Sequence, residues 1–90
     1  METTVVNGMA YGPVLTVTVG ASPFVFINPE SVPVMVMISA HVSSAIELSV
    51  DNTESWTDTG LSQGSFRLNP RQALRVTYNG QSPVINYTPN

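Results

Sequence analysis

The chain has 90 residues, with six acidic and three basic side chains, no cysteine and a net charge of −3. This length allows one small domain, and the absence of cysteine excludes a disulfide framework or a thiolate zinc site. Charged residues make up 10% of the chain and hydrophobic residues 42%. Disordered chains combine low hydrophobicity with high charge, so we expect a folded domain with few surface charges to keep it apart from its neighbours.

The charge pattern also limits the partners. The three basic residues are all arginines, whereas a nucleic-acid-binding domain normally carries a basic stripe. The longest apolar stretch is about half the length that a membrane-spanning helix needs. The N-terminus lacks a basic segment followed by an apolar one. We therefore expect no nucleic acid and no membrane as partners, and no secretion by a signal peptide.

Taken in chain order, the sequence predicts an extended N-terminal arm over residues 1–13 and a single β domain over residues 14–90. Asn7-Gly8 and Gly12-Pro13 interrupt the arm around a short apolar stretch at Val5 and Val6. Alternating apolar and polar residues predict strands over residues 14–19, 24–27, 34–42, 46–50, a short segment near 56, 65–68, 74–78 and 84–88.

Turn residues separate these strands every 8 to 12 residues or so, and Asn79-Gly80 is typical of a type I′ hairpin between the last two. About seven strands with such spacing indicate an all-β fold. We expect a small antiparallel β-sandwich or barrel.

The strand that begins at Val34 is apolar on both faces, although only one face of a sandwich strand meets the core. Either the arm or a loop covers the second face, or Met35 and Met37 face a partner chain, since methionine suits adaptable interfaces. Arginine is also enriched at interfaces, which makes Arg75 a candidate, although it can equally be a solvated residue. Val5 and Val6 complete the candidate interface, because the arm could lie across a neighbouring subunit.

No enzymatic chemistry is expected. His41 is the only histidine, and no serine lies in a nucleophile elbow. Residues 51–55 space oxygen ligands as some calcium loops do, but Trp56 occupies the position where such a loop needs glycine. A turn that uses Asp51 and Asn52 to bond its own backbone is the better interpretation. We predict no catalytic residue, no metal and no cofactor.

The aromatic residues allow a further interpretation. Trp56, Tyr78 and Tyr87, with Tyr11, could form an exposed platform on which a sugar stacks. Aromatic residues also fill the cores of small β domains, so a sugar-binding surface is the minor alternative.

Two segments resemble parts of small tailed-bacteriophage virion proteins. Residues 46–57 (IELSVDNTESWT) resemble a strand–turn–Trp unit of these proteins, and residues 74–89 (LRVTYNGQSPVINYTP) are similar to their usual ending. In that ending, a strand containing RVTY precedes a short turn and a proline-led strand with an aromatic residue near its end. The resemblance spans residues 46–89 and contains no catalytic or ligand motif.

The resemblance implies a capsid decoration, cement or head-tail accessory subunit. We expect a non-enzymatic virion structural protein that decorates or cements the capsid after assembly in the host cytoplasm. Its expected partners are the major capsid protein or other virion proteins, and its own copies in a homo-oligomer. The alternative is a tail, fibre or knob module that binds a glycan or protein of the host surface.

Overall fold

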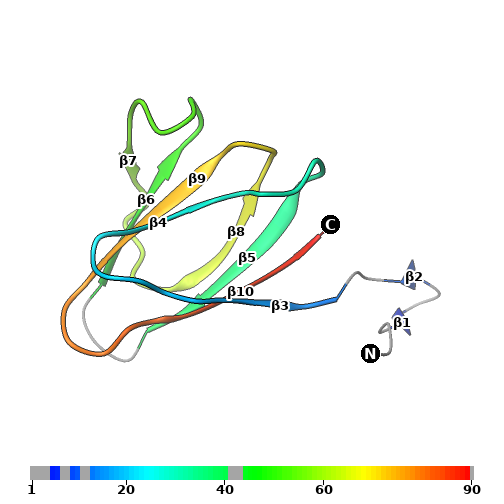
Figure 1. Cartoon of the computed structure of the whole chain (residues 1–90), viewed down its shortest axis with the longest axis horizontal. Coiled ribbons are helices and arrows are strands. Elements are labelled where there is room, and N and C mark those ends of the chain that lie inside the picture. The colour runs from blue at the N-terminus through cyan, green and yellow to red at the C-terminus, as the bar shows by residue number, and fades with distance from the viewer. Residues whose placement is uncertain (1–4, 7–8, 11–12, 41–43, 90) are drawn as a thin grey trace.

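The computed structural model describes residues 5–6, 9–10, 13–40 and 44–89. In this part of the chain, eight antiparallel strands form two four-stranded sheets that pack as a sandwich (Figure 1). One sheet has the order β3-β10-β5-β8 and the other β4-β9-β6-β7. The strands are β3 (Leu15–Val17), β4 (Phe24–Ile27), β5 (Val34–Ser39), β6 (Ser44–Ser49), β7 (Thr57–Asp58), β8 (Gly64–Leu68), β9 (Ala73–Tyr78) and β10 (Val84–Pro89). The predicted all-β sandwich is confirmed.

The order of the strands defines a jelly roll. If β3 to β10 are counted from one to eight, the two sheets have the orders 1-8-3-6 and 2-7-4-5. Each connection between consecutive strands of the sandwich crosses to the other sheet, except the β6–β7 connection. Eight strands in two sheets joined in this way form the double Greek key of jelly-roll domains.

The prediction of a hairpin at Asn79-Gly80 is wrong. Strand β9 ends at Tyr78 and β10 begins at Val84 in the opposite sheet, so the two do not pair. Gly80 has a positive φ of 85°, but Asn79 does not share this conformation as a type I′ turn requires. Packed sheets lie about 10 Å apart, and the connection must span that distance, which a two-residue turn cannot do.

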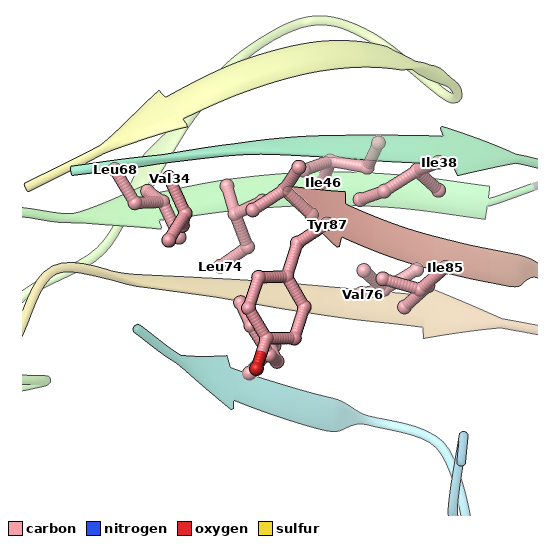
Figure 2. Packing of buried hydrophobic residues seen from close by; sticks show 10 residues of the cluster. Val34, Ile38, Ile46, Leu68, Leu74, Val76, Ile85 and Tyr87 are labelled. Carbon is pink, nitrogen blue, oxygen red and sulfur yellow. The ribbon is translucent and has the colours of Figure 1, made fainter. Parts of the chain in front are cut away.

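Strand alternation forms the core. In β5, Val34, Val36 and Ile38 point inward and are at most 3% exposed. The inward residues of the other strands interlock with them between the two layers (Figure 2). The remaining buried members of this cluster are Phe26, Ile46, Leu68, Leu74, Val76, Ile85 and Tyr87. The inward-facing apolar residues of the two sheets therefore form a single core.

Two short strands precede the sandwich. Strand β1 (Val5–Val6) pairs antiparallel with β2 (Met9–Ala10), and Figure 1 places both beyond the start of β3. This pair lies within the expected arm. Within the ranges that the structure describes, no helix is long and apolar enough to cross a bilayer.

Candidate interaction surfaces

The first surface is the outer face of the β3-β10-β5-β8 sheet, which we call the methionine face. Met35 and Met37 alternate with the buried residues of β5 and are only partly buried. Met35 lies between Thr88 and Arg67, and Met37 between Asn86 and Ser65. Arg67 is the only charged residue on these strands. The described residues therefore leave both methionines accessible on a face with one charge.

The second surface is the outer face of the β4-β9-β6-β7 sheet, where Arg75, Glu47 and Trp56 form a cluster. Arg75 on β9 lies directly opposite Glu47 on β6. Its Nε donates to Glu47 Oε1 at 2.8 Å and its Nη2 to Oε2 at 3.0 Å. The guanidinium carbon lies 4.5 Å from the centroid of the Trp56 ring, which is within cation–π range.

Glu47 and Arg75 both stay ionised at neutral pH. The hydrogen bond from Arg75 lowers the pKa of Glu47, while partial desolvation and the nearby Asp58 oppose that shift. The same hydrogen bond raises the pKa of Arg75. About one third of each side chain in the ion pair is exposed, 32% for Arg75 and 27% for Glu47. The cluster thus presents an ion pair with no net charge beside an aromatic ring.

The three aromatic residues predicted as a surface do not form one. Tyr87 is 9% exposed, and its ring centroid lies 5.1 Å from that of Phe26 in the core. Its hydroxyl donates to Glu30 Oε2 at 3.1 Å, and burial together with Glu30 raises the Tyr87 pKa. Tyr78 donates its hydroxyl hydrogen to the Gly20 carbonyl. Only Trp56 lies in the cluster on the outer face, because Tyr87 belongs to the inward set of β10.

The Asp51 carboxylate accepts hydrogen bonds from residues of its own turn and of the strand before it. The Ser55 backbone N–H donates to Asp51 Oδ1 at 2.9 Å, and the Ser55 hydroxyl donates to Oδ2. The Ser49 hydroxyl also donates to Asp51 Oδ1 at 2.9 Å. These bonds, led by that of the Ser55 side chain, lower the pKa of Asp51. The predicted bonding of the Asp51 side chain to the backbone of its own turn is confirmed.

The described residues offer little for small-molecule chemistry. They enclose no pocket and contain no group of three or more side chains that could hold a metal ion. His41 and Tyr11 lie outside the described residues. Val5 and Val6 are described only as the backbone of β1, so their place in an interface stays a prediction.

Sequence reasoning missed the partner of Arg75. Glu47 is the only charged residue of β6, and Arg75 is the only one of β9. Opposite charges on the wet faces of two neighbouring strands stabilise a cross-strand pair. The sequence contains these two opposite charges, but they predict an ion pair only when β6 and β9 are known to be neighbours.

No protein-family model, no curated protein and no solved structure matches the chain.

Proposed function

We propose that the chain is a non-enzymatic structural subunit of a tailed-phage particle, where it decorates or cements the capsid. The observation that carries this proposal is the methionine face. Met35 and Met37 are partly exposed there, beside a single charged residue, Arg67. Soft apolar side chains with little charge are what a protein partner can cover at low desolvation cost.

The architecture supports the proposal by analogy. Jelly rolls occur in viral capsid proteins, and also in lectins and cupins. A fold alone does not determine function, so the surfaces must distinguish these classes. Cupin-like chemistry would need a cavity, and the described residues enclose none. A weakly charged face with accessible methionines fits a protein partner, such as the outer surface of a capsid.

The mechanism is stabilisation by mass action. Each copy that binds the assembled capsid and not its separate subunits shifts the equilibrium toward the assembled particle. The gain per copy need not be large, because many copies act on one shell. Particles that lack the chain should therefore release DNA at a lower temperature than complete particles.

Particles provide the test. The gene is deleted from the genome that carries it, and purified particles with and without the chain are heated while DNA release is followed. Recombinant chain is then added back, and its binding is measured by co-sedimentation. Absence of the chain from purified wild-type particles, or DNA release at the same temperature in both preparations, would refute the proposal.

A matched pair of variants tests whether the methionine face is the surface that contacts the capsid. Met37→Lys should weaken re-binding by at least roughly tenfold, because it would leave an unpaired charge in a buried contact. Thr77→Lys places the same charge at an exposed position on the opposite sheet and should re-bind as the wild type does. Equal binding by the two variants would exclude the methionine face as the contact.

The second candidate is a tail or fibre module that binds a host-surface glycan or protein. The observation that favours it is the partly exposed Trp56 held against Arg75, because an oriented aromatic ring suits stacking on a sugar or a protein surface. Trp56→Ala should then abolish binding of the chain to host cells while keeping the far-UV spectrum of the wild type. Host-cell binding that is unaffected by this substitution would remove the candidate.

A further inference from the structure

The four edge strands of the sandwich differ in how well they are protected against pairing with another chain. Natural sheets protect their edges with charges, bulges or very short strands. The β8 edge carries Arg67 and begins at Gly64, whose φ is +141°. The β7 edge has two residues, one of them Asp58, and β3 has three residues. The β4 edge, Phe24–Ile27, has four residues, none of them charged.

The hydrogen-bond pattern shows which β4 residues face the open edge. The Asn28 N–H donates to the Gln72 carbonyl at 3.0 Å, in line with the register that pairs Phe26 with Leu74. In an antiparallel ladder, hydrogen-bonded and non-bonded pairs alternate. Phe24 and Phe26 therefore use their backbone groups to bind β9. The N–H and C=O groups of Val25 and Ile27 point away from the sheet.

The side chains at this edge are also open. Val25 is 39% exposed and Ile27 is 45% exposed, both on the outer face of the sheet. Both are β-branched, and such residues pack well in cross-strand pairs. Within the described part of the chain, the edge thus combines outward-pointing backbone groups with apolar side chains, and β4 itself carries no charged residue.

We propose that β4 pairs antiparallel with β4 of a second copy, about a two-fold axis that passes beside Phe26. Val25 would lie opposite Ile27 of the second copy, and Ile27 opposite its Val25, which forms about four backbone hydrogen bonds. The two sheets would then join into one continuous eight-stranded sheet.

A second copy fits this edge better than a foreign strand for two reasons. An antiparallel two-fold interface must be self-complementary, and the edge offers the same donor and acceptor at two positions that exchange under the two-fold axis. Pro23 and Pro29 bound the edge, and proline has no N–H to donate. A longer foreign strand would form few further backbone hydrogen bonds beyond these four residues, whereas a symmetric copy pairs with the whole edge.

The β4 edge would be the surface through which copies of the proposed virion subunit associate, so this inference rests on the proposed function. A four-residue edge buries less than the roughly 800 Å² per partner of a standard interface. Copies bound side by side on a capsid gain the high effective concentration that compensates for a small contact. The methionine face stays free for the capsid, because it belongs to the other sheet.

Cysteine cross-linking tests the register directly, since the chain has no cysteine of its own. Full-length Val25→Cys and Ile27→Cys proteins are mixed at roughly 1 mM, comparable to the effective concentration of a short tether. A glutathione buffer lets disulfides exchange until the least strained ones predominate. Mass spectrometry then gives the ratio of the mixed disulfide to the two homodisulfides.

The proposed register makes a specific forecast. Residues 25 and 27 of opposite copies would have Cα atoms about 5.5 Å apart, which suits a disulfide. Two copies of residue 25 would be about 9 Å apart, because they are offset by two residues along the strands, and could not be bridged. The mixed disulfide should therefore exceed each homodisulfide by roughly tenfold or more.

Three results would overturn the proposal. The first is the statistical ratio of about two to one to one, which a matched mixture of Thr77→Cys and Val84→Cys should give. The second is a dominant homodisulfide. The third comes from a separate mixture of Val25→Cys and Val6→Cys, where a dominant mixed disulfide would assign the edge to a neighbour's N-terminal arm. None of these results would affect capsid re-binding through the methionine face, so the two proposals fail separately.

A proline substitution provides an independent measurement. Because the Val25 N–H points to the open edge, Val25→Pro removes no hydrogen bond within the sheet. It should keep the far-UV spectrum of the wild type while abolishing the dimer in analytical ultracentrifugation at roughly 1 mM. Val25→Thr, which keeps the N–H and the branched shape, should still dimerise. A dimer that persists in Val25→Pro would contradict the pairing.

Discussion

Asn28 is the residue whose replacement tests the account of the fold most directly. It is 4% exposed at the end of β4. Its Nδ2 donates to the Val32 carbonyl at 3.0 Å and to the Leu68 carbonyl at 3.1 Å, while its Oδ1 accepts the Glu30 N–H at 2.8 Å. One side chain thus holds the β4–β5 crossover against the end of β8.

The cost of Asn28→Ala follows from these bonds. A buried group left without its partner costs about 1–3 kcal/mol, and the substitution removes two donations and one acceptor. We expect the free energy of unfolding to fall by about 2–4 kcal/mol, a large share of the total for a domain of this size. With an unfolding entropy of about 2.1 cal/mol/K per residue, the Tm should fall by about 10–20 °C.

Differential scanning calorimetry measures this difference against a matched control. Asn69→Ala changes the same residue type at an exposed position and should shift the Tm by no more than about 3 °C. Asn28→Asp keeps the shape and the acceptor but loses both donations, so it should destabilise at least as much as Asn28→Ala. If Asn28→Ala melts within the range of the control, the side chain does not hold the crossover as described.

Three further outcomes are expected. The pKa of Glu47 lies below its ordinary 4.5. The ion pair therefore stabilises the fold above pH 4.5, and this stability is lost as the pH falls through the folded-state pKa. In thermal melts between pH 7 and 3, the Tm of Glu47→Gln should therefore fall less with pH than the Tm of the wild type. Tyr87→Phe removes the bond to Glu30 and should cost about 1 kcal/mol, or about 5 °C in Tm by calorimetry; an unchanged Tm would show that the bond adds no stability. Arg75→Lys loses the planar contact with Trp56 and should shift tryptophan emission to longer wavelength, which an unchanged spectrum would contradict.

Most of the strands were predictable because apolar residues recur at every second position on their inner faces, whereas β7 (Thr57–Asp58) has no apolar residue. Phe24–Ile27 is observed as predicted, the strand that begins at Val34 ends at Ser39, and residues 41–42 of its predicted span lie outside the described residues. What alternation could not supply was the pairing. The turn residues Asn79 and Gly80 are local signals, and they do not say that the following strand must cross to the other sheet and insert between β3 and β5.

The candidate surfaces were predictable only in part for the same reason. Met35 and Met37 were singled out by their place on a doubly apolar strand, and they do lie on an outer face. Tyr87 was a candidate for the minor alternative of an exposed aromatic surface, but the phase of β10 turns it inward with Ile85. The bidentate bond to Glu47 and the stacking on Trp56 depend on three segments that only the tertiary structure brings together.

The position of β10 constrains how the chain can reach this structure. The last strand of the domain lies in the interior of its sheet and separates the first strand, β3, from β5. A nascent chain on the ribosome therefore cannot complete the sheet, or close the core around Ile85, until β10 has left the exit tunnel. Pairings between residues so distant in sequence also fold slowly, so β3 and β5 stay without their shared neighbour until β10 inserts between them.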